Sequence, residues 1–120
     1  MMRELYHGTT GDNILGIMHT RSLRPGVDGT LFFSENRFES VLMHGADRRR
    51  GASFAVKMRV HLPPGVTTER IATPGVVDTL SVRTTFPILA DVLELYVRQA
   101  RASSVQVIRG AADIQRFLQK

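Results

Sequence analysis

The sequence predicts a single domain of mixed α+β class over residues 1–120. Two patterns predict this class. Residues 52–63 alternate apolar and polar side chains as a half-buried strand does, and residues 9–23 space their apolar side chains as an amphipathic helix does. A chain of 120 residues suits one domain that buries roughly two-thirds of its unfolded surface. Helices are expected early in the chain, and strands dominate its centre.

The first half of the chain is expected to alternate strands and helices. Thr10 or Asp12 can cap the first helix, because both side chains accept hydrogen bonds from free backbone N–H groups. The cluster "RPGVDG" is typical of a turn. The predicted elements are a strand over 3–7, a helix over 9–23, a turn over 24–29, a strand over 30–35 and a helix over 35–51.

The second half is expected to contain mostly strands, and one segment has two interpretations. Residues 87–102 can form a helix, since Pro87 suits a first helical turn and the apolar residues that follow fit a stripe. The same segment can contain a strand, "VLELYV". The other elements are a strand over 52–63, a loop over 63–75, a strand within 76–86, a strand over 104–110 and a helix over 111–120.

Composition excludes several classes of site and favours an anionic partner. The chain contains no cysteine, so it forms no disulfide and no thiolate metal site, and its four histidines lack the spacing of metal ligands. No apolar run is long enough to cross a membrane and no signal peptide opens the chain, so the expected site of action is the cytoplasm. The net charge is +5, and 14 of 16 basic residues are arginine, which favours phosphate or carboxylate partners.

Two short motifs contain the candidate chemistry. In "LYHGTT", His7 lies at a strand end and can donate a hydrogen bond to a hydroxyl or act as an acid or base, while Gly8 allows close approach to the backbone. In "LFFSE", one of two adjacent aromatic residues should be core and the other can line a pocket. Both motifs also have purely structural interpretations, as a turn histidine and a core strand. The run "DRRRG" is either a favourable charge at a helix end or a phosphate contact.

These motifs and their order resemble the ADP-ribosyltransferase fold, in its diphtheria-toxin-like and poly(ADP-ribose)-polymerase-like branch. The elements concerned are strand-"YHGT", helix, "LRPG", strand-"LFFS", helix and a long alternating strand. The resemblance covers residues 4 to 62 well and the remainder loosely. It implies a split β-sandwich with short flanking helices and a His-Tyr-Glu triad. RNA 2′-phosphotransferases share this fold and a similar histidine-glycine start.

The resemblance assigns binding roles to residues of the first two motifs. His7 matches the histidine that contacts a ribose hydroxyl of NAD, and Gly8 matches the glycine whose backbone holds the nicotinamide amide. Ser40 matches the serine of the second motif, and Met43 stands where the family has a stacking tyrosine, which is a departure from the pattern. The expected NAD-binding residues are His7, Gly8, Thr9, Phe33, Ser34, Ser40, Met43 and His44.

The third motif of the family is a glutamate at the start of a later strand, and two residues compete for this role. By position, "VVDTLSV" is the best equivalent, with Asp78 as a shortened replacement. Glu94 fits only if "VLELYV" is a strand. A carboxylate here stabilises the positive charge that develops on the sugar as the nicotinamide bond breaks.

The function that the resemblance implies is an NAD-dependent ADP-ribosyltransferase, of the kind found in bacterial toxin and effector domains. It would transfer ADP-ribose to a protein or nucleic-acid acceptor, without a metal or a membrane, and an immunity protein and delivery within a larger secreted toxin are implied by analogy. Two alternatives stay open. One is an NAD glycohydrolase or a 2′-phosphotransferase that uses Arg24, Arg59 and Arg83. The other is a non-catalytic module that binds nucleotide or nucleic acid.

Overall fold

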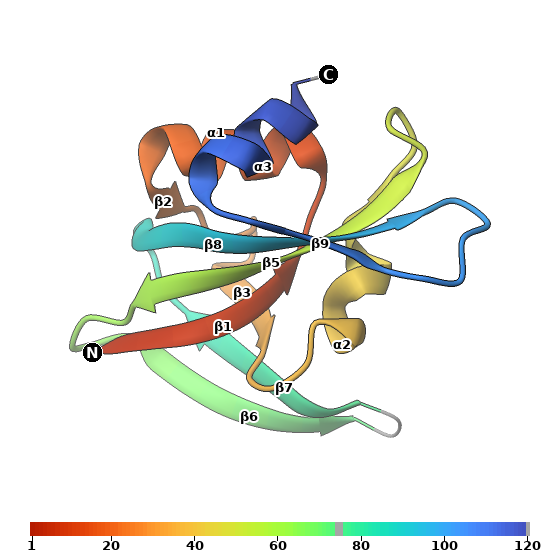
Figure 1. Cartoon of the computed structure of the whole chain (residues 1–120). Helices are drawn as coiled ribbons and strands as arrows, with labels where there is room; N and C mark the ends of the chain where they lie inside the picture. Colours follow the sequence, from red (N-terminus) through yellow and green to blue (C-terminus); the bar gives the residue numbers. More distant parts are fainter. Residues whose placement is uncertain (74–75, 120) are drawn as a thin grey trace.

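A computed structural model describes residues 1–73 and 76–119, without the side chains of 72–78. In this part of the chain, nine strands form one sheet with antiparallel pairing, and three short α-helices lie against it (Figure 1). The mixed α+β class is therefore confirmed. The strands are β1 (Met2–Gly8), β2 (Ser22–Leu23), β3 (Thr30–Ser34), β4 (Ala46–Asp47), β5 (Ala52–His61), β6 (Thr67–Thr73), β7 (Val76–Arg83), β8 (Ile88–Gln99) and β9 (Gln106–Arg109). The helices are α1 (Gly11–Thr20), α2 (Glu39–Leu42) and α3 (Ala111–Leu118), with a 3-10 turn η1 (Met43–Gly45).

The sheet divides beside its central strand, β1. The strand order is β2-β8-β5-β1-β3-β7-β6, with β4 added to β5 and β9 added to β8. β1 pairs with β5 along its whole length, but it meets β3 at the single pair Tyr6 and Ser34. Figure 1 shows β7 and β6 below β1. The sheet therefore opens next to His7, the residue that follows Tyr6.

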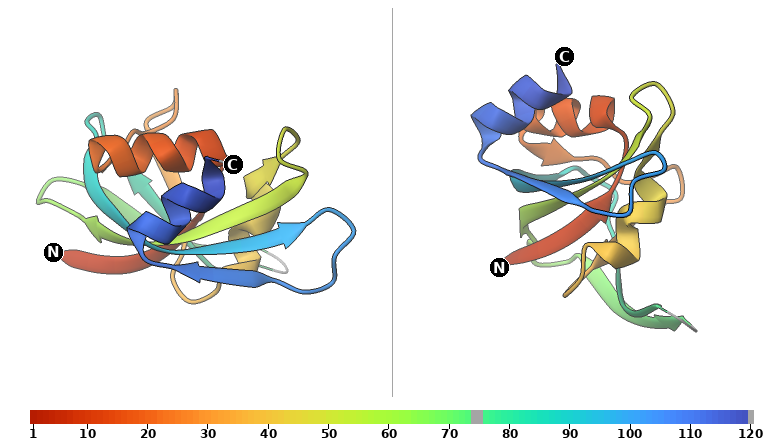
Figure 2. Two further views of the ribbon diagram at one scale, coloured as in Figure 1. Left: turned by 45° about the horizontal axis from the view of Figure 1, so that its top comes forward. Right: turned by 45° about the vertical axis from the view of Figure 1, so that its right-hand side comes forward.

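Helices α1 and α3 cover one face of β5 and β8 and close the main core (Figures 1 and 2). The even positions of β5 face this core, as the alternation of residues 52–63 predicts. The fully buried side chains of this core include Leu5, Ile14, Phe33, Met58, Leu95 and Ile114. Their burial fixes the register of β5, because a slip by one residue would turn every apolar side chain outward.

A smaller aromatic cluster lies on the opposite face of the sheet. The rings of Phe38 and Tyr96 stack with centroids 4.3 Å apart, and Tyr6 meets Tyr96 edge-on at 5.8 Å. Val41 and Leu42 of α2 pack into the same cluster. This second apolar contact holds α2 against β1 and β5, so α2 forms a fixed wall beside the opening of the sheet.

The predicted helix over 35–51 is confirmed only over α2, because the residues that follow form η1 and β4. The reason is the packing of Gly45 on β5. A Cβ atom at this position would lie 1.7 Å from the carbonyl oxygen of Phe54. The chain must leave the helical path to make this backbone contact, and it then pairs Ala46 with Ser53 as a short strand.

The helical interpretation of residues 87–102 is also wrong, and the strand interpretation is confirmed by β8. The register of β8 on β5 shifts between Lys57 and Met58, which leaves a β-bulge in β8. Before the bulge Ile88 and Val92 face the core, whereas after it Leu95 does. This change of parity places buried residues three apart, and such spacing imitates a helix.

Two further boundaries differ from the predictions. Residues 63–75 are not all loop, because β6 forms an edge strand on β7. Its sequence, "TTERIAT", is polar and therefore typical of a loop. The first helix ends at Thr20 instead of continuing to 23, since Arg21 takes a left-handed conformation (φ 54°) and the next two residues pair with β8.

A buried ion pair fixes the start of α1 relative to β4. The Asp47 carboxylate accepts hydrogen bonds from the Gly11 N–H at 2.9 Å and from the Arg50 guanidinium at 3.0 Å. Arg50 also donates to the Leu118 carbonyl oxygen at the end of α3, at 2.9 Å. Burial alone would raise the pKa of Asp47, but these hydrogen bonds lower it overall. The loop that follows His7 is thereby anchored at its far end.

Candidate functional site

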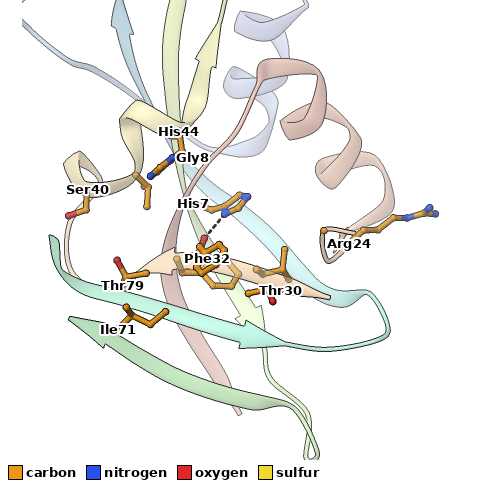
Figure 3. Close-up of a pocket in the computed structure, with 13 residues that line it drawn as sticks. His7, Gly8, Arg24, Thr30, Phe32, Ser40, His44, Ile71 and Thr79 are labelled. Carbon is orange, nitrogen blue, oxygen red and sulfur yellow. Dashed lines mark hydrogen bonds between the residues drawn. The ribbon is translucent and has the colours of Figure 1, made fainter. Parts of the chain in front are cut away.

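A cavity of about 590 Å³ occupies the opening between β1 and β3 (Figure 3). This volume is in the range of small-molecule sites. Its walls come from β1, β3, α2, η1, the turn before β3 and the β6–β7 pair. Its lining residues are His7, Gly8, Arg24, Gly26, Thr30, Leu31, Phe32, Phe33, Ser40, Val41, His44, Ile71 and Thr79.

His7 is the residue of this cavity best suited to chemistry. Its Nδ1–H donates to the Phe32 carbonyl oxygen at 2.8 Å, since a carbonyl can only accept. Desolvation and the nearby His44 lower the pKa of His7, although the Phe32 carbonyl partly raises it. The ring is therefore neutral near pH 7, and its Nε2 atom has a lone pair that can accept a hydrogen bond from a hydroxyl.

The lowered pKa of His7 predicts a pH-dependent stability. Between the folded pKa of this ring and the ordinary value of 6.5, the unfolded chain binds a proton that the folded chain does not. The free energy of unfolding should therefore rise with pH through this window and level off above it. Urea denaturation of the wild type and of His7→Asn from pH 4.5 to 8 measures the difference. If the free energy of unfolding depended on pH equally in the two proteins, the lowered pKa of His7 would be contradicted.

Gly8 borders the cavity, but a neighbouring helix is what requires a glycine here. A Cβ atom at this position would lie 1.9 Å from the Val41 carbonyl oxygen of α2. We expected Gly8 to admit a ligand to the backbone. Gly8 does line the cavity, and the structure also shows a close approach by α2, which brings Ser40 and Val41 to the wall of the cavity.

The two aromatic residues of β3 divide between core and cavity. Phe33 is fully buried, and its ring supports His7 from behind, with centroids 5.4 Å apart. Phe32 is half exposed, so its ring presents a face that a planar ligand can contact. We predicted Phe33 as a ligand-binding aromatic residue; both rings line the cavity, and the more exposed one belongs to Phe32.

The remaining residues of the second motif lie in different surroundings. Ser34 is buried, and its hydroxyl accepts a hydrogen bond from the Arg37 N–H at 3.1 Å, which stabilises the turn after β3. Ser40 and His44 line the cavity, from α2 and η1. Met43 is 69% exposed and is not among the lining residues. The structure thus brings Ser40 and His44, but not Met43, to His7.

A second cavity of about 370 Å³ adjoins the first and shares His7, Arg24 and Leu31 with it. Thr9 lines this second cavity, and its hydroxyl accepts a hydrogen bond from the Asn13 amide at 3.0 Å. Arg24 lies at the rim of both cavities with its guanidinium extended away from His7 (Figure 3). Within the described residues, the Arg24 side chain has no hydrogen bond or ion pair.

The structure does not bring Glu94 to His7. Glu94 pairs with Lys57 in the sheet, and His7 pairs with Val56, whose side chain lies in the main core. Adjacent strand residues face opposite sides, so Glu94 lies on the other face of the sheet. There its carboxylate accepts hydrogen bonds from Tyr96 at 2.9 Å and Arg109 at 2.7 Å. Burial raises the pKa of Glu94, but these bonds and Lys57 lower it overall.

The side chain of Asp78, the other candidate carboxylate, lies outside the described residues. Its backbone belongs to β7, next to Thr79, which lines the first cavity. No aspartate or glutamate is among the lining residues that the structure describes for this cavity. Asp78 therefore stays a prediction from the sequence.

Eight lining residues of the first cavity were missing from the expected NAD-binding residues, and Phe32, Ile71 and Thr79 show why. Phe32 shares its strand face with the polar residue Thr30, and this parity is a signal that it lies outside the core. Ile71 was not predicted as a lining residue because its segment was predicted to be a loop. Thr79 reaches the cavity only because β7 pairs with β3, which no local pattern predicts.

Comparisons with protein-family models, curated proteins and solved structures found no match for this chain. Across the described ranges 1–73 and 76–119, no three histidine, aspartate or glutamate side chains gather in a way that could hold a metal ion. In the same ranges, no helix is both long and apolar enough to span a bilayer. The feature of this chain that points to a function is therefore the cavity around His7.

Proposed function

We propose that this domain binds NAD in the two adjoining cavities and transfers its ADP-ribose to an acceptor, releasing nicotinamide. The observation that supports this best is the orientation of His7. The Phe32 carbonyl holds Nδ1–H, so Nε2 is left as a hydrogen-bond acceptor at the border of both cavities. A neutral imidazole with a defined acceptor suits a sugar hydroxyl.

The shape of the site suits the parts of NAD in order. The nicotinamide ring lies in the first cavity against the exposed face of Phe32, and the adjoining ribose gives its hydroxyl hydrogen bond to His7 Nε2. The remaining nucleotide continues towards the second cavity. Arg24 is the one arginine or lysine among the described lining residues of the two cavities, so the diphosphate lies beside it.

The reaction breaks the bond between the ribose carbon and the nicotinamide nitrogen. The electron pair leaves with nicotinamide, which becomes neutral, and positive charge develops on the sugar. The acceptor then bonds to the same carbon and loses a proton. His7 orients the sugar through its hydroxyl, and Asp78, by its place in the sequence, is the candidate carboxylate for the developing charge.

The finer fold that we propose is the ADP-ribosyltransferase split β-sandwich, as found in toxin and effector domains. Two features support it. The "YHGT" motif ends β1, and the sheet divides between β1 and β3 directly beside this motif. The acceptor can be a protein or a nucleic acid, and an immunity protein is the expected partner of a toxin.

A second candidate function is a module that binds NAD or another nucleotide without turnover. The observation that favours it is the lack of a carboxylate among the described residues lining the first cavity. An NAD glycohydrolase is the third, with water as the acceptor. The three functions differ in two measurable products, free nicotinamide and labelled acceptor.

The test uses NAD labelled on its adenylate part, the purified domain and a cell lysate. The proposed function predicts nicotinamide release together with label on a macromolecule, and nuclease or protease treatment identifies the acceptor class. Release in the presence of lysate without transfer indicates a glycohydrolase. Binding of NAD without release indicates a binding module, and the absence of binding overturns all three.

Substituting the two candidate carboxylates separates their roles in the same assay. We expect Asp78→Asn to lower nicotinamide release by about a hundredfold, since it removes the charge beside the sugar. Glu94→Gln should leave release within about threefold of the wild type, because Glu94 lies on the other face of the sheet. A large loss in Glu94→Gln with unchanged thermal stability would contradict this assignment.

A further inference from the structure

Three unpaired arginines gather at a hollow that the NAD site does not use. Arg48, Arg98 and Arg101 line this hollow of about 460 Å³, and all three are exposed. In the part of the chain that the structure describes, none of their side chains makes an ion pair or hydrogen bond. We propose that this hollow, hereafter the arginine hollow, binds the phosphate backbone of a nucleic acid.

Strand pairing places the three arginines together from two distant turns. Arg48 lies in the turn between β4 and β5, while Arg98 and Arg101 lie at the end of β8 and in the turn that follows it. The Ala100 N–H donates to the Gly51 carbonyl oxygen at 2.8 Å, which joins the two turns. Figures 1 and 2 show both turns on the same side of the molecule.

The arginine hollow has a positive charge that its surroundings leave uncompensated. Asp47 also lines it, but this carboxylate is 6% exposed and is occupied by the Gly11 N–H and the Arg50 guanidinium. The nearby Asp12 pairs with Arg49 and Arg50. Other groups thus neutralise both carboxylates. The positive charge of the three arginines remains, and an anion would complement it.

The chemistry of the arginine hollow favours a row of phosphates over a single small anion. Its three guanidiniums come from two turns and are all exposed, so each can meet a different phosphate bidentately. No aromatic side chain is among its described lining residues, so bases are not stacked there. Contacts of this kind bind nucleic acid by charge and give little sequence preference.

The arginine hollow lies close to the proposed NAD site along the chain. His44 lines the first cavity and Ala46 lines the hollow, so their Cα atoms are at most about 7 Å apart. A nucleic acid bound at the hollow would pass near the wall that η1 forms. Its use as the acceptor rests on the proposed function, whereas the binding itself does not.

The experiment measures binding of a labelled 20-nucleotide RNA and DNA by fluorescence anisotropy from 50 to 200 mM salt, without NAD. We expect binding that weakens with salt, and a triple variant Arg48→Ala, Arg98→Ala, Arg101→Ala that binds about a hundredfold less tightly at 0.1 M salt. The slope of log affinity against log salt should fall by about 2, from three lost phosphate contacts. A control variant, Arg37→Ala, Arg109→Ala, Arg116→Ala, loses the same charge at exposed positions elsewhere and should bind within about threefold of the wild type.

Three results would overturn the proposal. They are no binding by the wild type at 50 mM salt, equal losses in the two triple variants, and competition by polyglutamate as strong as that by unlabelled nucleic acid. The last result would indicate that the arginine hollow binds an acidic protein. Because NAD is absent throughout, failure here leaves the proposed function intact, and failure of nicotinamide release leaves this proposal intact.

Discussion

We expect His7→Asn to lower nicotinamide release from NAD by at least about a hundredfold while the domain folds as the wild type does. The asparagine amide can replace Nδ1–H as the donor to the Phe32 carbonyl oxygen, so the local structure is kept. It has no atom in the place of Nε2, and the hydrogen bond to the ribose hydroxyl is lost. Initial rates of release at saturating and limiting NAD measure the effect on kcat and on kcat/KM.

Two further variants make this experiment specific to Nε2. In His7→Gln the longer amide reaches the place of Nε2, so part of the activity should return relative to His7→Asn. His19→Ala removes an exposed histidine in the last turn of α1 and should leave activity unchanged. If His7→Asn kept its activity within about threefold of the wild type, the proposed role of His7 would be refuted.

Gly45→Ala is expected to destabilise the domain by about 3 kcal/mol or more. The added Cβ atom would lie 1.7 Å from the carbonyl oxygen of Phe54 and 2.7 Å from its carbonyl carbon. Both are backbone atoms of a central strand, so no side chain can rotate to make room. Either η1 separates from β5 or β5 bends, and each movement also displaces His44 at the cavity wall.

The control for this substitution is Gly16→Ala. Gly16 lies in the exposed part of α1, and a Cβ atom there would meet nothing within 4 Å. Alanine should stabilise the helix by about 0.5–1 kcal/mol, because glycine loses more backbone entropy on folding. Urea denaturation of both variants measures the two changes. A Gly45→Ala variant within 1 kcal/mol of the wild type would show that the contact with Phe54 is not tight in solution.

Local patterns predicted the elements whose residues repeat without interruption. The alternation of residues 52–63 predicted β5 and the side that faces the core, and the spacing of Ile14 and Ile17 predicted α1. In both cases one face packs against the same core along the whole element, so the period of the sequence equals the period of the structure.

Local patterns failed where a contact between distant segments interrupts an element. The bulge opposite Lys57 reverses which residues of β8 are buried, and so gives a strand the spacing of a helix. Gly45 ends a helix because it must meet Phe54, a constraint that lies nine residues away and on another element. Neither interruption has a local signal.

For the candidate site, the sequence by itself determined that His7 lies at the end of a strand and precedes a helix, and that the chain is basic without cysteine. Only the tertiary structure decided what surrounds His7. It left Phe32 exposed at the cavity while Phe33 is buried in the core behind it, and it put Glu94 on the far face of the sheet. The physical reason is that a motif is set by neighbours along the chain, whereas a cavity is set by which strands pair and where they separate.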